Sequence, residues 1–531
     1  MAASRLQAGA PVVRSIACVL IVAAALAGAA TADTFRRANG NDPDTLDPQK
    51  YELLSEGIIL RDLFEGLTTQ DADNRIVPGQ AESWTASPDG LTWTFTLREG
   101  LVWSDGAPLT AEDFVAGMRR AADPKTGAKI PEVTYKLKNA RAILAGTMPV
   151  EALGVAAPDA RTVVLTLEAP SPLIPTILAH AVLAPVPRHV IAAHGEDWIK
   201  PGLMVTNGPY VLASWEPSDK VRIVKNPRFR DAASVAMDEV VFFPSDDMEM
   251  ALKRFRAGEL DLVPQLPPTK IAWARKEAAE ALALTPVAQL RYLEINHTLA
   301  KFQDVRVRRA LALAIDRETI AGPISGGSVI AAYGIVPRTL EGYEGALFDF
   351  AGTAQAERAA AAKALLAEAG YGPDNPLTLE LRVMSDAWAK PLSAAIVSMW
   401  GKAGIKASVL AAEAKVHYAA VGEGQFEVAL SGWFGGDDPE TFMWLFQTGG
   451  GLNESGYSNA AFDAASARAE TAMELGERYR LFAEAERMLL EDVATVPLFW
   501  TIQASLISPR IDGFKPTPRG LPRSRYARPR G

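Results

Sequence analysis

The stretch SGWFGGDDPETFMWLF, residues 431–446, combines two adjacent carboxylates with several aromatic side chains. Asp437 and Asp438 follow a Gly-Gly pair, and Trp433 and Phe434 stand directly before that pair. Aromatic side chains usually favour burial, whereas carboxylates favour water unless a partner neutralises them. Two glycines give the backbone the freedom to bring both kinds of group to one surface. This stretch is therefore the first candidate for a binding site.

The same residues also fit the start of a helix. Asp is a favoured N-cap residue and Pro a favoured first helical residue, so Asp437, Asp438 and Pro439 could begin a helix that runs to Phe446. Trp444 and Phe446 would then be core residues, and the two aromatics before the glycines could be core residues as well. Helix capping and ligand contact are compatible, so both interpretations stay open.

Other residues that could perform chemistry are sparse. The sequence has no nucleophile-elbow, zinc-protease or phosphate-loop motif. Its five histidines form no pair at metal-ligand spacing; they are His180, His189, His194, His297 and His417. The sequence therefore predicts a protein that is not an enzyme and that uses no metal or cofactor.

Residues 1–32 have the pattern of a secretory signal peptide. Two arginines precede an apolar run over 16–30, and small residues then fit cleavage after Ala32. Most of this apolar run follows the single cysteine, Cys18, whereas the cysteine of a lipoprotein stands at the end of the run. The run is also too short for a retained membrane anchor, which is the alternative interpretation. The sequence predicts a soluble, thiol-free periplasmic protein without a lipid anchor.

Length and composition set further bounds. A chain of 531 residues that is 48% apolar can bury a large core, which we expect to be divided among two or three domains. The formal net charge of −9 argues against nucleic acid as a partner, because phosphate binding needs a basic surface.

Strand and helix patterns alternate along the chain. LTWTFTL at 91–97 alternates as a half-buried strand does, and VVFFP at 240–244 is a short apolar strand before a helix that Ser245 can cap. Later segments repeat this order: a helix in 357–370, a strand at 377–383, a helix at 388–402 and a strand at 406–411. Strand–helix–strand units predict α/β domains with largely parallel sheets.

Several segments together carry a family resemblance. They are LRDLFEGL (60–67), AESWTASPDGLTWTFTLREGLVWSDGAPLTAEDF (81–114), TNGPYVL (206–212), FRAGELDLV (255–263), INHTLAKFQDVRVRRALALAIDRE (295–318), KALLAEAGYG (363–372) and GYSNAAFDA (456–464). In this order they resemble the extracytoplasmic solute-binding proteins of the peptide/nickel family of ABC transporters, and most of all the oligopeptide-binding proteins. The resemblance covers essentially all of the chain after residue 32.

The resemblance implies an α/β fold like that of the type II periplasmic binding proteins. Two main lobes would close on a ligand, and a smaller domain would be inserted in the first. The implied bounds are 33–64, 186–289 and 497–531 for lobe I, 65–185 for the inserted domain II and 290–496 for lobe III. The chain would cross between lobes near 290–297 and 496–502, and the C-terminal Arg-Tyr segment would pack on the first lobe.

The resemblance also implies a peptide receptor and its site. Ser431, Gly432, Trp433 and Phe434 would pair with the ligand backbone as with an added strand, which binds peptides regardless of side chains. Asp437 or Asp438 would neutralise the ligand's α-ammonium, and Glu52 would face the ligand from the first lobe. The partners would be a peptide and the permease subunits of an inner-membrane ABC transporter, and the protein would be a monomer.

Some positions depart from the family pattern. The spacing from Trp433 to Pro439 is one residue shorter than usual, so either aspartate could be the ammonium partner. Basic residues that can meet a ligand carboxylate are replaced by Leu430 and Val421. Arg230 stands where the family has a large aromatic residue, and we interpret it as a solvated surface arginine rather than a replacement carboxylate partner.

These departures leave other functions open. Within the family, the ligand could be an oligosaccharide, an opine or a nickel complex, although no histidine lies in the matched pocket segments. From another class, a periplasmic chaperone could hold unfolded chains on the same groove, and a periplasmic hydrolase is a third possibility. The sequence leaves the ligand's identity and length and the cognate permease undetermined.

Overall fold

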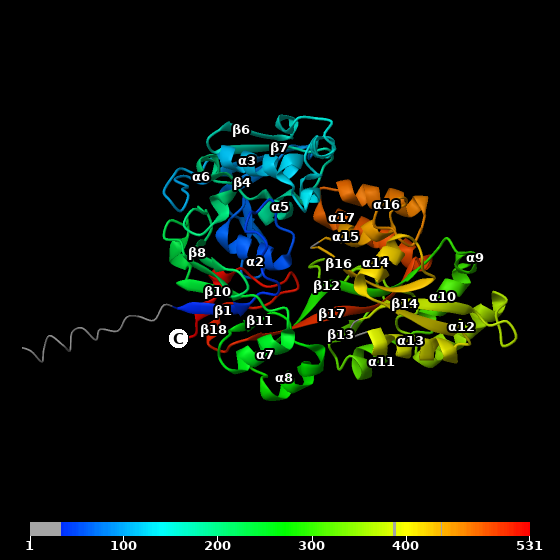
Figure 1. The fold of residues 1–531 in the computed structure, drawn as a ribbon. Helices are drawn as coiled ribbons and strands as arrows, with labels where there is room; N and C mark the ends of the chain where they lie inside the picture. Colours follow the sequence, from blue (N-terminus) through cyan, green and yellow to red (C-terminus); the bar gives the residue numbers. More distant parts are fainter. Residues whose placement is uncertain (1–32, 386–388, 437) are drawn as a thin grey trace, which may run out of the picture.

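Two long strands, β12 (Leu282–Ile295) and β17 (Thr495–Ile507), join the two halves of the molecule. The computed structural model describes residues 33–385, 389–436 and 438–531. Figure 1 shows a first body built from the N-terminal half and the C-terminal tail, and a second body built mainly from the yellow and orange part of the chain. β12 and β17 are antiparallel and pair from Leu282 with Leu506 to Glu294 with Thr495. Residues 290–295 and 496–502 of the segments predicted to be extended lie within these strands, whereas residues 296 and 297 follow the end of β12.

One sheet extends through both bodies. Its strand order in the described residues is β15 (Lys406–Ala412), β14 (Thr378–Met384), β16 (Val428–Phe434), β12, β17, β11 (Leu262–Val263), β1 (Thr34–Ala38), β10 (Glu239–Phe243), β9 (Lys220–Lys225) and β8 (Tyr210–Glu216), and β13 (Val329–Ala331) also pairs with β17. The strands predicted at 240–244, 377–383 and 406–411 are therefore confirmed within a residue or two.

The prediction of largely parallel sheets is wrong. β1 is parallel to β10 and β11, and β14 is parallel to β15 and β16. The other described pairs of this sheet are antiparallel. Short turns such as that between β8 and β9 produce antiparallel neighbours, whereas parallel neighbours need a long crossover connection. β12 and β17 also run through both bodies in opposite directions.

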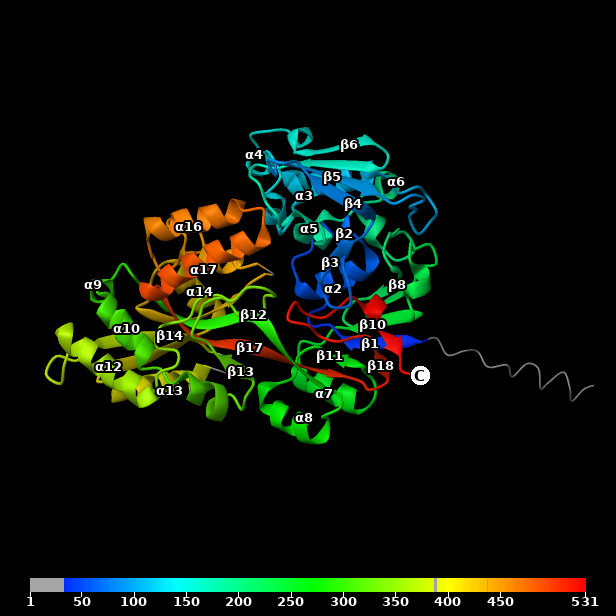
Figure 2. The ribbon, with the colours of Figure 1, turned by 180° about the vertical axis from the view of Figure 1, so that it is seen from behind.

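A smaller antiparallel sheet lies at the top of the first body. Its order is β4 (Ala81–Ala86), β5 (Thr92–Leu97), β7 (Thr162–Thr166) and β6 (Val155–Asp159), with helix α3 (Ala111–Ala122) packed against it and a short hairpin of β2 (Thr68–Gln70) and β3 (Ile76–Pro78) nearby. Figure 2 shows this sheet from behind. Trp93, Phe95 and Leu97 are buried on alternate positions of β5, which confirms the alternation predicted for 91–97.

The described helices cover the faces of these sheets. In the first body they are α2 (Leu54–Leu63), α3, α4 (Ala140–Leu144), α5 (Ile174–Ile177), α6 (Arg188–His194), α7 (Met248–Arg256) and α8 (Ile271–Glu277). In the second they are α9 (Ala300–Gln303), α10 (Val305–Leu313), α11 (Arg317–Thr319), α12 (Gln355–Glu368), α13 (Ala389–Lys402), α14 (Ala414–Gly422), α15 (Glu440–Met443), α16 (Ala460–Thr471) and α17 (Leu475–Glu491). The cap expected from Ser245 is instead Asp247, whose carboxylate accepts the N–H groups of Glu249 and Met250. None of these helices is both long and apolar enough to cross a membrane.

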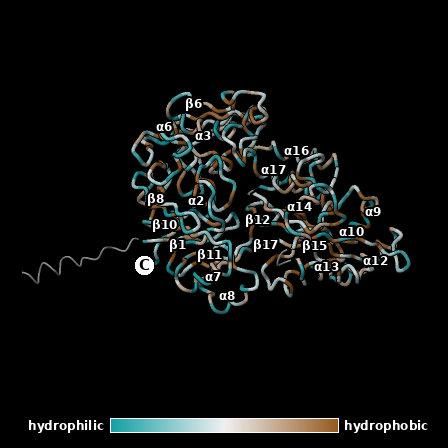
Figure 3. The backbone as a smooth tube through the Cα atoms, viewed as in Figure 1, coloured by the Kyte–Doolittle hydropathy of each residue, from teal (hydrophilic) through white to brown (hydrophobic). Residues whose placement is uncertain are grey.

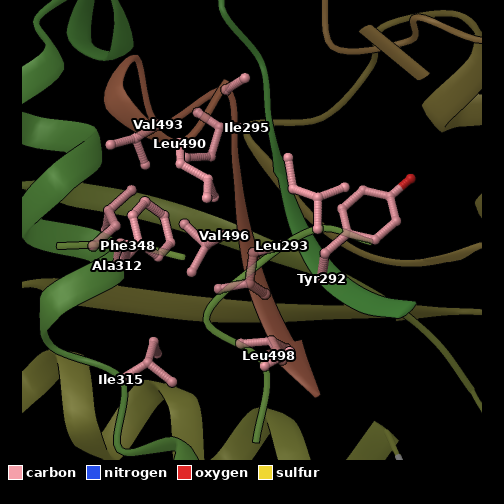
Figure 4. Packing of buried hydrophobic residues seen from close by; sticks show 14 of the residues in the cluster. Tyr292, Leu293, Ile295, Ala312, Ile315, Phe348, Leu490, Val493, Val496 and Leu498 are labelled. Atoms are coloured by element: carbon pink, nitrogen blue, oxygen red, sulfur yellow. The ribbon is translucent and has the colours of Figure 1, made fainter. Parts of the chain in front are cut away.

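Each body has its own hydrophobic core. One cluster lies within residues 290–500, and another joins residues 35–262 with the C-terminal residues 511–527. Figure 3 shows apolar residues, in brown, inside both bodies. Figure 4 shows Leu293 of β12 packed with Val496 and Leu498 of β17, and all three are fully buried. Burial of each such side chain contributes about 1.5–3 kcal/mol, so the crossing strands are fixed by the core of the second body.

The C-terminal tail packs on the first body, as the resemblance implies. The N–H of Ser524 donates to the carboxylate of Asp62 at 2.9 Å, and Arg525 forms a buried ion pair with Glu65 at 3.3 Å. A short pair of strands, β18 (Ile511–Asp512) and β19 (Arg528–Pro529), ends the chain. Arg525 is therefore a structural part of this body.

Candidate functional site

The C-terminal half of β16 has one open edge. On one side it pairs with β12 throughout, with Ser431 opposite Tyr292 and Phe434 opposite Gln289. On the other side β14 pairs only with the first two residues, Val428 and Ala429. Among the described strands, none pairs with the outer edge of residues 430–434. The backbone groups on that edge are therefore available to an extended ligand, which is how strand addition begins.

Side chains along this open edge become progressively more exposed. Ser431 is buried, Trp433 is half-buried and Phe434 is 72% exposed. The indole N–H of Trp433 donates to the carbonyl of Thr441 at 2.9 Å, which fixes the ring between β16 and α15. Trp433 therefore has a structural contact beside any ligand role, and Phe434 is an apolar side chain left in solvent, which is uncommon for a phenylalanine.

The Gly-Gly pair lets the end of β16 approach helix α15 closely. A Cβ atom at Gly435 would lie 2.0 Å from Cε2 of Phe442, whose ring is fully buried. At Gly436 the same atom would lie 3.2 Å from Cγ2 of Thr441, a contact that a small shift relieves. The N–H of Gly435 also donates to the carbonyl of Ala288 at 2.8 Å. Gly435 is thus required by close packing, and this contact sets the path of the acidic loop.

Asp438 is buried in an ion pair. Its two carboxylate oxygens accept from Nε and Nη2 of Arg478 at 2.9 and 2.8 Å, and one of them also accepts the N–H of Glu440 at 2.9 Å. The expected capping of the following helix is confirmed for Asp438 by this last bond. A ligand ammonium at Asp438 would have to compete with Arg478, so its ligand role stays a prediction. Asp437 lies outside the described residues.

The expected helix to Phe446 is short. α15 covers Glu440–Met443, and a 3-10 turn then covers Trp444–Phe446. Phe446 is buried, as predicted for a core residue. The same prediction for Trp444 is wrong, because its side chain is 36% exposed. A turn of three residues per repeat rotates the side chains away from the positions that a continuous α-helix would give them.

A buried carboxyl group that the site analysis missed lies behind the open edge. Glu294 of β12 is 5% exposed, and its Oε2 accepts the hydroxyl of Ser431 at 2.8 Å. Burial raises the pKa of Glu294 to about 7, the bond from Ser431 opposes this shift, and the charge of Glu454 adds to it. A lone acid in the apolar strand segment LRYLEIN was the available signal.

Glu52 lies on the first body, just before helix α2. Its side chain is exposed, and its N–H donates to the carboxylate of Glu56 at 2.9 Å. Glu56 is buried and also accepts the N–H groups of Asp44, Thr45 and Leu53, so one carboxylate holds the loop that carries Glu52. Leu54, the first residue of α2, has a side chain that is 80% exposed. Glu52 and residues 431–434 therefore belong to different bodies.

Of the positions that depart from the family pattern, two carry buried apolar side chains and the third carries an arginine in an ion pair. Leu430 and Val421 are buried, and Val421 packs with Phe426 and Ala429. The interpretation of Arg230 as a solvated surface residue is wrong. Its guanidinium pairs with the buried carboxylate of Glu65, at 2.6 Å from Nε to Oε2, and its side chain is 17% exposed. Sequence could not reveal this pairing, because the two residues are 165 positions apart.

Known proteins resemble this chain along most of its length. The family of bacterial extracellular solute-binding proteins, family 5 Middle, matches residues 75–454. The probable deoxycholate-binding periplasmic protein YgiS of Escherichia coli is 37% identical over 484 residues, which is 90% of each chain. The periplasmic oligopeptide-binding protein OppA of Escherichia coli is 34% identical, over 91% of this chain and 89% of its own.

Two solved structures allow a comparison of the arrangement. The unliganded open form of the murein tripeptide-binding protein MppA has a TM-score of 0.86, with 31% identity over 94% of this chain and 98% of its own. Haemophilus influenzae OppA in complex with the peptide RPPGFSPFR has a TM-score of 0.74, with 30% identity over 94% of this chain and 99% of its own. The fold is therefore that of these periplasmic binding proteins, and the arrangement of this chain resembles the open form more.

Proposed function

Because this chain belongs to the family 5 bacterial extracellular solute-binding proteins, we propose that it is the periplasmic receptor of an ABC importer and that its ligand is a peptide. The observation that carries this proposal is the open outer edge of residues 430–434 in β16. Every peptide offers the same N–H and C=O groups to such an edge, so the edge suits ligands of varied sequence. Relatives named as binders of oligopeptides and of murein peptide support it.

The proposed site lies between the two bodies. Ser431, Gly432, Trp433 and Phe434 pair with the ligand backbone, and Glu52 approaches from the first body. Asp437 neutralises the ligand's α-ammonium, since the bonds from Arg478 to Asp438 favour the other aspartate for this role. The proposed division of the chain is lobe I at 33–64, 186–289 and 497–531, domain II at 65–185 and lobe III at 290–496.

Ligand binding draws the lobes together in this proposal. The greater likeness to an unliganded open form than to a peptide complex supports an open arrangement in the absence of ligand. Paired crossing strands absorb a rotation through small changes along their length without opening a core. The closed receptor, a monomer released by cleavage after Ala32 and without a lipid anchor, then delivers the peptide to the permease subunits of the transporter.

The experiment has two steps. Mass spectrometry of ligands that co-purify with the native protein identifies a peptide, and calorimetry then compares this peptide with its Nα-acetylated form. We expect acetylation to weaken binding by the wild type by on the order of 3–5 kcal/mol, because it removes one partner of a buried ion pair. Asp437→Asn should lose most of this difference between the two peptides, because the carboxylate that reads the ammonium is already gone.

Asp438→Asn is the matched control for that titration. It should lower folding stability, since Arg478 loses one of its two buried carboxylate partners, yet keep the full effect of acetylation. The opposite result, in which only Asp438→Asn is indifferent to acetylation, would assign the ammonium to Asp438. Equal losses in all three proteins would remove both acids from the ligand site.

A steroid carboxylate is the second candidate ligand. The relative YgiS is named as probably deoxycholate-binding, and the highly exposed Leu54 and Phe434 offer apolar surface on both bodies. Deoxycholate titrated into the protein after unfolding and refolding to remove bound molecules tests this candidate. Saturable binding of deoxycholate without binding of co-purified or synthetic peptides would replace the peptide proposal.

A chaperone function would give a different result. It would suppress the aggregation of unfolded chains without stoichiometric binding of a ligand.

A further inference from the structure

The two bodies also touch away from the crossing strands, and one of these contacts is an ion pair with a buried acceptor. Nζ of Lys136, in the first body before α4, lies 2.9 Å from Oε1 of Glu440, the first residue of α15 in the second body. The bodies also approach closely at Gly90 of the first body, where an added Cβ atom would lie 3.0 Å from Sδ of Met473 in the second. Figure 2 shows α4 above α16 and α17 across the same boundary.

The acceptor side of this pair is rigid. Glu440 is 2% exposed, and its other oxygen, Oε2, accepts from Nη2 of Arg478 at 2.6 Å. Arg478 is fully buried and also donates to Asp438 and to the carbonyl groups of Ala469 and Glu470. Because Arg478 has no freedom to rotate without breaking several bonds, Glu440 is held in one position, ready for the ammonium of Lys136.

Charge balance makes Lys136 important to the other body. The carboxylates of Asp438 and Glu440 both accept from the guanidinium of Arg478 in the second body, and the backbone carbonyl of Glu470 accepts from it as well. The pKa of Glu470 lies above its ordinary value, mainly because of burial and also because of the nearby charge of Glu440. The charges of Lys136 and Arg478 oppose this shift. Without Lys136, the two buried carboxylates of Asp438 and Glu440 would share the single cation of Arg478. The first body thus supplies the second cation of a cluster that lies in the second body.

We propose that Lys136 is a positioning residue for ligand binding: its bond to Glu440 ties domain II to Asp438 through Arg478 and stabilises the open arrangement of the lobes. The proposal rests on the proposed receptor function. The tie runs from Lys136 through Glu440 and Arg478 to Asp438, so a change in lobe arrangement and a change at the ligand loop are coupled. Removing the ammonium should therefore favour the closed arrangement even without ligand.

Distances between spin labels test this directly. The single cysteine of the sequence lies in the predicted signal peptide, so Lys125→Cys and Lys415→Cys place unique labels on exposed sites of the two bodies. We expect Lys136→Met to shift the ligand-free distance distribution towards the closed value, with the open-to-closed ratio falling about three- to tenfold, as for loss of one partly buried ion pair. Lys136→Arg, which keeps the charge, should restore the wild-type distribution.

Lys138→Met is the matched control, because Lys138 is exposed two residues away and the substitution removes the same charge. An unchanged distribution in Lys136→Met, or an equal shift in Lys138→Met, would overturn the proposal. Adding the peptide identified by co-purification separates this failure from that of the receptor function. If the peptide still shortens the distance in the wild type, the lobes close and only the role of Lys136 is wrong.

Discussion

At the scale of single residues, Glu294 couples the proposed ligand strand to pH. Burial raises its pKa to about 7 in the folded protein, against an ordinary value of 4.5. A folded pKa above the unfolded one means that the protonated form is favoured by folding. Its contribution is fully present below pH 4.5 and is lost as the pH rises to about 7, because the buried carboxylate must then ionise.

We therefore expect Glu294→Gln to stabilise the protein in alkaline solution. Relative to the wild type, its free energy of unfolding should rise by about 2–3 kcal/mol between pH 5 and pH 8, since each pKa unit corresponds to about 1.4 kcal/mol. Urea unfolding at the two pH values measures this difference. Glu491→Gln, at an exposed site, is the control and should show little change. A pH-independent difference for Glu294→Gln would mean that the carboxyl titrates normally.

At this scale the sequence identified Asp438 as a functional or capping residue, but it did not identify Arg478 as the partner of its carboxylate. The helix-capping interpretation was available because the signal lies within three residues, from Asp438 to Glu440. Arg478 lies 40 residues further along, and nothing in its local sequence distinguishes a buried arginine from the exposed Arg480. The identity of a buried ion pair is a property of the tertiary fold, so spacing patterns could not predict it.

At the scale of elements, the packing between β16 and α15 depends on one glycine of the pair. We expect Gly435→Ala to destabilise the protein by about 1–3 kcal/mol, because the new methyl group overlaps the buried ring of Phe442 and forces the two elements apart. Gly436→Ala is the neighbouring control and should cost much less, since Thr441 can move slightly. Urea unfolding compares the two. Equal costs would show that general loss of backbone freedom, rather than the Phe442 contact, requires the glycines.

The positions of several strands and helices could be predicted well from the sequence. The strands at 91–97, 240–244 and 377–383 and the helices near 357–370 and 388–402 appear close to their expected positions, since local periodicity carries that information. Strand direction was predicted wrongly, because the partner of a strand such as β12 is chosen by contacts far along the chain. The open edge of β16 could be expected only through the family resemblance.

At the scale of the whole molecule, we expect ligand to make the protein more compact. If the crossing strands β12 and β17 allow the lobes to close, small-angle scattering should give a smaller radius of gyration with the co-purified peptide than without it. Ligand must first be removed by unfolding and refolding, and the scattering of a non-binding peptide serves as the control. An unchanged profile at saturation would contradict closure.

The position of β17 in the sequence sets the order in which the two bodies can finish folding as the chain is synthesised. β11 of the first body pairs with β1 on one side and with the end of β17 on the other, at Leu262 with Ile507 and Val263 with Leu506. A chain made from its N-terminus leaves this edge open until nearly the last residues have emerged, whereas the core within 290–500 already has all its members. The body that is synthesised first is thus finished last. An unpaired strand edge of this kind can pair with the wrong strand, so the newly made chain depends most on chaperones before the end of β17 has emerged. Loss of the segment from Leu506 onward would leave the sheet of the N-terminal body incomplete.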